Sequence, residues 1–236
     1  MNNILNQNGE FTKEVTRDFF KNVYGYMFGA LAISGLIAYQ AGTPEFFQAY
    51  FITPQGTISP VFYVVAFAPL GLGLLIQMAY KRLSLAVLMV LFIAYSALMG
   101  LSLGSIFLVY AMPSIVSTFF VSAGAFAGMA ILGYTTKTDL TKFGSLLYMV
   151  FIGIFIAGIV NIFMKSEMMD FVISVIGVFV FTGLTAYYMQ QLKNMSQDSD
   201  LSALDRNKLS LVGGLMLYIL FINLFLSLLR IMGSRE

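Results

Sequence analysis

Residues 209–231 read LSLVGGLMLYILFINLFLSLLRI, an apolar run whose single charge is Arg230. An α-helix rises 1.5 Å per residue, so a helix needs about 20 apolar residues to cross the hydrocarbon core of a bilayer. This run is long enough. The 236-residue chain has the same character throughout, because 59% of its residues are hydrophobic and only 10% are charged. A typical soluble domain is about 25% charged. The composition therefore excludes a soluble enzyme and predicts an all-α integral membrane protein.

Six further apolar runs lie upstream, and together they predict seven transmembrane helices. The first run follows a polar segment at residues 1–21, in which no cleavable signal peptide is visible. The turn between the third and fourth runs depends on Ala111-Met112-Pro113, and without that turn the count falls to six. The membrane domain is expected to cover residues 22–233 and to leave 234–236 as a short tail. The spans are expected at about 22–40, 60–79, 83–110, 113–134, 143–163, 171–190 and 209–231.

The basic residues predict the orientation of these spans. Of the 13 Lys and Arg, three lie on the side opposite the amino terminus, namely Lys165, Arg230 and Arg235, which leaves ten on the amino-terminal side. Positive residues are concentrated in cytoplasmic loops. The amino-terminal segment is therefore expected in the cytoplasm and, with seven spans, the carboxyl terminus outside.

Several classes of chemistry are excluded by composition. The chain has no Cys and no His, so it cannot form a disulfide, a thiolate nucleophile or a histidine-dependent protease site. All 11 Asp and Glu lie outside the predicted spans or at their ends, which makes an ion-coupled pump a distant third hypothesis. The acidic loop at residues 191–208 lacks the Gly and Glu of a calcium-binding loop. We expect no metal, no cofactor and, with a net charge of +2, no nucleic acid.

Neutral polar residues remain inside the spans. Asn161 and Asn223 are expected to form interhelical hydrogen bonds rather than to bind a ligand. Asp139 and Asp170, just before the fifth and sixth spans, are expected to cap free helix amides. Small residues at a spacing of four predict close packing within a monomer, with dimerisation as the alternative. They are Gly25 and Gly29, Gly100 and Gly104, Gly124 and Gly128, and Gly153 and Ala157.

Three motifs occur in order along the second half of the chain. They are Gly133-Tyr134-Thr135-Thr136-Lys137-Thr138-Asp139-Leu140-Thr141, then Gly183-Leu184-Thr185-Ala186-Tyr187 through Gln190, Leu192 and Lys193, and finally Leu217-Tyr218 with Phe221-Ile222-Asn223-Leu224-Phe225 to Leu229-Arg230. Together they resemble the bacterial branch of the Bax inhibitor-1 family, most strongly over residues 124–233. The resemblance implies six helices around a central seventh, a bacterial inner-membrane location, calcium leak, and a link to a membrane-bound ATP-dependent protease. It implies structural roles for Lys137, Asp139 and Asn161.

Two positions depart from that resemblance. Family members with a pH-gated leak carry two aspartates that share a proton, whereas this chain has Tyr188 and Leu220 at those positions. An unperturbed tyrosine has a pKa of about 10 and leucine has no acidic proton, so the coupled titration is absent. For the two positions to meet, the sixth span must run past Gln190, as far as Lys193.

The neighbours of these positions give further expectations. Asn223 lies one turn beyond Leu220 and could partner the Tyr188 hydroxyl or hold a pore-lining water. Lys81 and Arg82 match a basic cluster that bears on the aspartates in relatives. Because those carboxylates are missing here, both residues are expected to anchor the cytoplasmic side of the second span.

The leading hypothesis is a multi-pass protein of the cytoplasmic membrane whose core conducts calcium ions without the usual pH gate. The rival is a regulator or binding partner of the membrane-bound protease that transports nothing, because the polar segment Asn2 to Lys21 would face the cytoplasm. Neither hypothesis makes the protein an enzyme. A monomer in the lipid bilayer is expected.

Overall fold

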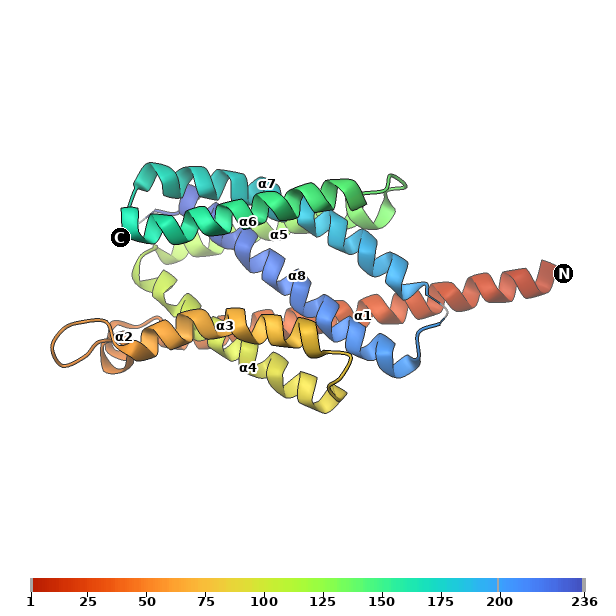
Figure 1. Ribbon diagram of the computed structural model, residues 1–236, viewed down its shortest axis with the longest axis horizontal. Coiled ribbons are helices and arrows are strands. Elements are labelled where there is room, and N and C mark those ends of the chain that lie inside the picture. Colours follow the sequence, from red (N-terminus) through yellow and green to blue (C-terminus); the bar gives the residue numbers. More distant parts are fainter. Residues whose placement is uncertain (1, 199, 235–236) are drawn as a thin grey trace. The chain divides into compact units, whose positions relative to one another are not determined.

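The computed structural model describes residues 2–198 and 200–234, with side chains from Glu14 onward, so Arg235 and Glu236 of the predicted tail lie outside the described residues. The described elements are helices (Figure 1), apart from one isolated bridge between Ile52 and Ile58. They are α1 (Asn2–Ala41), α2 (Pro44–Phe51), α3 (Pro60–Ala79), α4 (Leu85–Leu103), the 3₁₀ helix η1 (Gly104–Leu108), α5 (Met112–Thr135), α6 (Thr141–Met164), α7 (Glu167–Ser196) and α8 (Ala203–Met232).

Six helical stretches in the described part are long and apolar enough to cross a bilayer: α3, α4 with η1, α5, α6, α7 and α8. They coincide with six of the seven predicted spans. The predicted turn at Ala111-Met112-Pro113 is confirmed, because the preceding helix ends at Leu108 and α5 begins at Met112. Pro113 lies in the first turn of α5, where a proline needs no hydrogen-bond acceptor. α7 extends through Ser196, well beyond the predicted end at Gln190.

The remaining predicted span, residues 22–40, is not among those six and stays a prediction. It forms the second part of α1, which continues without a break through the predicted boundary at Lys21 and Asn22. Its apolar character is diluted by glycine, serine and tyrosine. One face of α1 is nonetheless buried at helical spacing, as in a helix that packs along one side. Its buried residues include Thr16, Phe19, Val23, Met27, Ala30, Ser34, Ala38 and Ala41.

The chain divides into two compact units. Unit 1 runs to Tyr110 and includes Ser196–Tyr218, whereas unit 2 comprises Ala111–Met195 and the chain from Ile219 onward. In unit 1, α4 lies close to α1, because a Cβ on Gly100 would be 2.7 Å from the Ser34 carbonyl oxygen and one on Gly104 would be 3.0 Å from the Ala41 Cβ. The predicted close packing of small residues is thus confirmed for this pair. No atom of another element lies within 4 Å of the Cβ positions of Gly25, Gly29, Gly124, Gly128 or Gly153.

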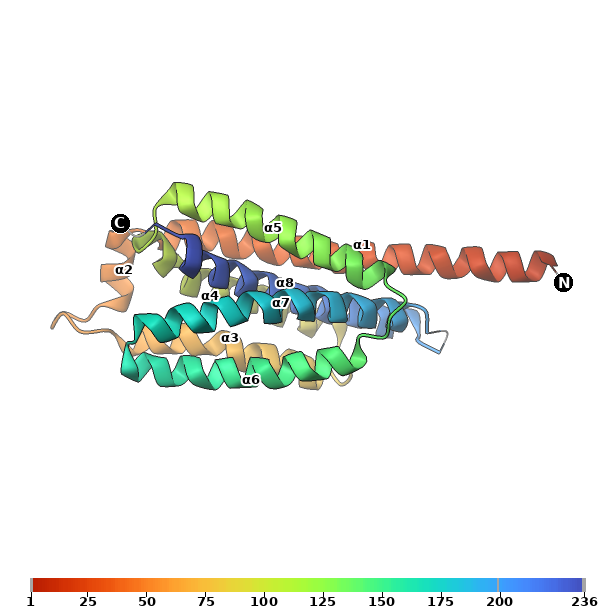
Figure 2. The same ribbon diagram turned by 90° about the horizontal axis from the view of Figure 1, so that it is seen from above.

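In unit 2, three glycines allow helices to approach α7 closely. Gly133 of α5 lies against the backbone of Ala186, and Gly144 of α6 lies against the ring of Tyr187. On α7 itself, a Cβ at Gly177 would be 2.7 Å from the Ser227 hydroxyl oxygen of α8. Figures 1 and 2 both show α6 and α7 side by side. α6 exposes most of its surface, since 6% of its most apolar window is buried, against 67% for α8.

Candidate functional site

The first two sequence motifs meet at the connection between α5 and α6. The Gln190 side-chain oxygen accepts a hydrogen bond from the Leu140 amide at 2.8 Å, and its side-chain nitrogen donates to the Thr138 carbonyl at 2.8 Å. One turn further along α7, the Lys193 ammonium donates to the Tyr134 carbonyl at 2.8 Å and lies 5.1 Å from the centroid of its ring. We call Gln190 and Lys193, with residues 134–140, the loop clamp.

Asp139 and Lys137 lie on the exposed side of this connection. The Asp139 carboxylate accepts a hydrogen bond from the Thr141 amide at 2.9 Å, in the first turn of α6. Asp139 thus satisfies one free amide of the first turn of α6, although the N-cap position itself is Leu140. Hydrogen bonds from the Thr141 hydroxyl and amide hold the pKa of this carboxyl below its ordinary value.

Tyr188, one of the two positions where the resemblance implies an aspartate, lies in a tyrosine cluster with Tyr148 and Tyr187. The Tyr148 hydroxyl donates a hydrogen bond to the Tyr188 hydroxyl, and the Gln191 side-chain nitrogen donates to the Tyr187 hydroxyl at 3.2 Å. The rings meet edge to face, with centroids 6.3 Å apart for Tyr148 and Tyr187 and 5.8 Å for Tyr187 and Tyr188. A neutral hydroxyl pair therefore occupies the place where relatives are expected to carry a carboxylate.

Leu220, the other position where the resemblance implies an aspartate, is buried, with 4% of its surface exposed. Asn223 turns back on its own helix, because its side-chain nitrogen donates to the Ile219 carbonyl at 2.8 Å. The described hydrogen bonds thus join Tyr188 to Tyr148 and do not join it to Asn223. Counted at 1.5 Å per residue from the contact of Gly177 with Ser227, Leu220 lies about 10.5 Å along α8 and Tyr188 about 16.5 Å along α7. The two positions are therefore about one helical turn apart in depth.

Lys81 and Arg82 belong to unit 1, in the connection between α3 and α4, and both are exposed. The Lys81 ammonium lies 5.9 Å from the centroid of the Tyr80 ring. An exposed cation beside a tyrosine at a helix end is typical of the membrane interface. Their role as a cytoplasmic anchor stays a prediction.

The other end of unit 2 contains a pocket of about 310 Å³, where α6 ends, α7 begins and α8 ends. Asn161 shapes it, because its side-chain oxygen accepts from the Ser166 amide at 3.0 Å and its carbonyl accepts from the Lys165 amide at 2.7 Å. Lys165 has a φ of 50°, the left-handed conformation that commonly ends a helix. Asn161 therefore bonds to the turn after its own helix rather than to a neighbouring one. This end pocket is lined by Asn161, Lys165, Ser166, Glu167, Asp170, Phe171 and Arg230.

An ion pair joins α7 to α8 in the end pocket. The Asp170 carboxylate lies 3.6 Å from the Arg230 guanidinium, and the two side chains are 34% and 45% exposed. Asp170 is in the first turn of α7 and Arg230 in the last turn of α8, so each charge opposes the dipole of its helix end favourably. Asp170 was expected to precede its helix, but α7 begins earlier, at Glu167. Half-exposed pairs contribute about 0–1 kcal/mol to stability.

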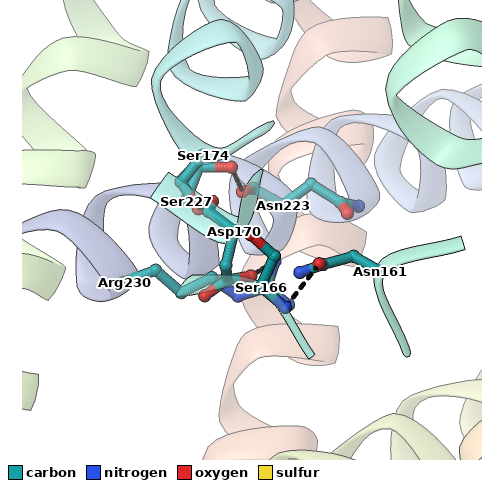
Figure 3. Close-up of polar contacts among 7 residues, drawn as sticks. All are labelled: Asn161, Ser166, Asp170, Ser174, Asn223, Ser227 and Arg230. Carbon is teal, nitrogen blue, oxygen red and sulfur yellow. Dashed lines mark hydrogen bonds and ion pairs between the residues drawn. The ribbon is translucent and has the colours of Figure 1, made fainter. Parts of the chain in front are cut away.

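Polar side chains continue from this ion pair along the facing sides of α7 and α8 (Figure 3). Ser174 is 1% exposed and its hydroxyl donates to the Asp170 carbonyl at 2.7 Å. Ser227 is 8% exposed and its hydroxyl donates to the Asn223 carbonyl at 2.8 Å. We call these five residues, Asp170, Ser174, Asn223, Ser227 and Arg230, the polar column. Neither its serines nor its ion pair was recognised in the sequence, although Asp170 and Arg230 fall at span ends on the same predicted side.

Comparison with known sequences decides the family. The family model described as "Inhibitor of apoptosis-promoting Bax1" matches residues 16–236. The chain belongs to the Bax inhibitor-1 family. The inner membrane protein YbhL of Escherichia coli K12 is 43% identical over 220 residues, which are 92% of each chain. A protein of Borreliella burgdorferi is 41% identical over 222 residues, 94% of each chain. A membrane protein of Streptococcus pyogenes serotype M1 is 33% identical over 218 residues, 92% of this chain and 93% of that one.

The family model confirms the resemblance to the Bax inhibitor-1 family that the sequence suggested. With six apolar helices of spanning length in the described residues, the relatives identify a multi-pass inner membrane protein. Within unit 2, the family's first and second motifs form the loop clamp, and the third ends at Arg230 of the end pocket.

Proposed function

We propose that this Bax inhibitor-1 family protein provides a calcium-leak pathway across the inner membrane and lacks the two-aspartate pH gate. The proposal is supported by the family match together with Tyr188 and Leu220, which stand where the family resemblance implies two aspartates. The Tyr188 hydroxyl is paired with that of Tyr148, and Leu220 is buried. Neither position supplies an acid that titrates near neutral pH, because an ordinary tyrosine has a pKa of about 10 and leucine has none.

The proposed pathway uses the seven-span arrangement of the family, in which the second part of α1 is the first span and α8 is the seventh, central one. The high buried share of α8 supports a central place, since 67% of its most apolar window is buried. The ten-to-three division of the 13 basic residues supports an amino terminus in the cytoplasm. In that orientation the loop clamp faces the cytoplasm and the end pocket faces outward.

Calcium flux into liposomes tests the proposal. The purified protein is reconstituted into vesicles loaded with a calcium-sensitive dye, and the initial rate of dye response is measured at intervals between pH 6 and 8. We expect a slow leak above that of protein-free vesicles, with a rate that changes little over this range. A steep pH dependence would contradict the missing gate, and a rate equal to that of empty vesicles would contradict the leak itself.

A gain-of-function variant tests the two positions directly. Tyr188→Asp with Leu220→Asp should create a pH response, because two nearby carboxylates share a proton and titrate in two separate steps. The matched control, Tyr188→Asn with Leu220→Asn, has similar size and polarity but no acid, and its flux should stay independent of pH. A flat profile for the double aspartate variant would show that these two positions cannot form the gate in this chain. Because the two positions differ in depth by about one turn, this outcome is a strict test of whether they correspond to the two family aspartates.

The second candidate function is regulation of a membrane-bound ATP-dependent protease. It is favoured by α1, whose helix extends from Asn2 through the polar segment, with Glu14, Arg17 and Asp18 on exposed positions. A helix that continues beyond the apolar residues offers a surface to a partner protein. Crosslinking in native membranes, followed by purification, should recover the protease with the full chain and lose it when residues 2–13 are deleted. Absence of the protease from both eluates, with unchanged membrane-protein turnover in a deletion strain, would remove this candidate.

A further inference from the structure

One contact separates the end pocket from the rest of the polar column, which consists of two buried serines and the half-buried Asn223. Asp170 and Arg230 line the pocket, whereas Ser174, Ser227 and Asn223 do not. In Figure 3, Asp170 lies between Ser166, on the pocket side, and the two serines. Exposure falls sharply across this contact, from 34% and 45% for the two charged side chains to 1% for Ser174 and 8% for Ser227. The two serines behind the ion pair are therefore buried, whereas Asn223, further along α8, is half-buried.

The residues behind the ion pair form a polar lining that is satisfied without water. Ser174 and Ser227 each donate to a carbonyl one turn earlier in their own helix, so both hydroxyls can stay dry. Each hydroxyl oxygen also keeps lone pairs that can accept a hydrogen bond from water or bind a cation. Gly177 brings α7 close to α8 at this level, because a side chain there would collide with Ser227. The closed state thus needs both the close helix contact and the charge contact above it.

The ion pair is suited to open, because alternative partners line the same pocket. Lys165 and Glu167 carry one charge of each sign beside Asp170 and Arg230. If the pair separates, each charge remains near solvent and near an opposite charge, so neither is stranded in an apolar environment. A buried pair without such neighbours would be held far more firmly.

We propose that the Asp170–Arg230 ion pair closes the outer end of the polar column, and that its separation admits water and small cations to Ser174, Ser227 and Asn223. The expected effect of this separation on calcium flux rests on the proposed function. The expected change in solvent access is independent of the proposed function, because it concerns only residues of unit 2. In this protein the closing contact thus uses fixed charges of opposite sign rather than a shared proton.

Cysteine accessibility tests the closure, and the absence of native cysteine makes the signal clean. Ser174→Cys introduces a single thiol behind the ion pair with little change in size. Proteoliposomes carrying this variant are exposed to a membrane-impermeant maleimide, and the labelling rate is measured. We expect slow labelling with Asp170 and Arg230 intact, and labelling at least tenfold faster when Arg230→Gln or Asp170→Asn is added. Equal rates in the three proteins would overturn the proposal.

Two restoring variants separate loss of charge pairing from loss of shape. Asp170→Arg with Arg230→Asp reverses the pair and should return labelling to the slow rate. That reversal opposes both helix dipoles, so Asp170→Glu with Arg230→Lys is made in parallel and keeps each sign in place. Fast labelling in both restored proteins would overturn the proposal. Met168→Cys, 72% exposed, serves as the labelled control, and Ser122→Cys, fully buried in α5, should stay unlabelled unless the protein unfolds.

Calcium flux measured on the same variants distinguishes this closure from the proposed function. Faster labelling without calcium flux in any variant would support the closure and contradict the calcium leak. Calcium flux that is equal in all variants, with equal labelling, would support the leak and overturn the closure. If both hold, Arg230→Gln should raise the labelling rate and the calcium flux together.

Discussion

The two ends of unit 2 hold their helices together by different chemistry. At the loop clamp, Gln190 and Lys193 bond to backbone groups of the α5–α6 connection. At the end pocket, α7 and α8 are joined by two partly exposed charged side chains, Asp170 and Arg230. A backbone partner is fixed by its helix or turn, whereas two long charged side chains can exchange each other for water or for neighbouring charges. The loop clamp is therefore built to stay fixed and the end pocket to rearrange.

This difference places the adjustable contact at the opposite end from the one that the family resemblance implies. Tyr188 lies two residues before Gln190, next to the loop clamp, and its hydroxyl is bonded to Tyr148. The remaining charge pair lies where α7 begins and α8 ends. Variants that weaken the loop clamp should therefore cost much more stability than variants that break the ion pair.

The largest loss of stability is expected from Gly133→Ala. A Cβ at this position would overlap the Ala186 carbonyl oxygen and lie 2.6 Å from the Ala186 Cα, so α5 would have to move away from α7. Overpacking typically costs about 1–3 kcal/mol, and this case is expected at or above the upper end because the contact is with backbone. Gly128→Ala is the matched control on the same helix, because no atom of another element lies within 4 Å of its Cβ position. Unfolding in mixed micelles with increasing dodecyl sulfate, followed by circular dichroism, measures both.

The control should be unchanged or more stable, since alanine is favoured over glycine inside a helix by about 1 kcal/mol. If Gly133→Ala matches Gly128→Ala in stability, α5 and α7 do not pack as described. The helix contact that brings Gln190 and Lys193 to residues 134–140 would then be wrong.

A smaller loss is expected from Gln190→Ala, which removes both hydrogen bonds of one side chain. The Leu140 amide and the Thr138 carbonyl lose their partners, and the part-buried amide is then left unpaired. Leaving a buried polar group unsatisfied costs about 1–3 kcal/mol. Gln191→Ala, at the next position of α7, removes one bond to the Tyr187 hydroxyl at 3.2 Å and should cost less. Limited proteolysis of residues 136–140 should accelerate only in Gln190→Ala, and equal rates in the two variants would argue against the loop clamp.

The fold followed from the sequence wherever apolar runs decide it. α3 has its predicted bounds, Pro60–Ala79, because an apolar run lies between Ser59, which caps its first turn, and the connection that contains Lys81 and Arg82. The end of α7 did not follow, since four of the six residues 191–196 are polar and this part of the helix is supported by contacts of Gln190 and Lys193 with a distant loop. The extension of α1 through residues 2–21 was also not predicted, because hydropathy marks a membrane boundary and not the end of a helix.

The candidate site was predicted less completely than the fold. The bond of Asp139 to a free amide of α6 follows from its place before that helix, which is a local property of the sequence. The pairing of Tyr148 with Tyr188 depends on how α6 is rotated against α7. The close contact of Gly144 with the Tyr187 ring, between residues more than 40 positions apart, helps to set that rotation. The Asp170–Arg230 pair was within reach of sequence reasoning, because consecutive spans are antiparallel and their outer ends carry opposite charges. The prediction of Asp170 only as a helix cap left out its pairing with Arg230.

The smallest loss of stability is expected from Arg230→Gln, which removes one positive charge from the end pocket while keeping much of the side chain. The pair is 34% and 45% exposed at 3.6 Å, so its loss should lower the free energy of unfolding by about 0–1 kcal/mol. Arg206→Gln at the other end of α8 is the matched control. The Arg206 guanidinium donates to the carbonyls of Asp198 and Leu201 at 3.1 and 3.4 Å, and its loss should cost more because those bonds hold a loop. The same micelle titration compares the stability of Arg230→Gln and Arg206→Gln with that of Gly133→Ala and Gln190→Ala. If Arg230→Gln destabilised the protein as much as Gln190→Ala, the ion pair would be a structural contact as firm as the loop clamp, and the contrast between the two ends of unit 2 would disappear.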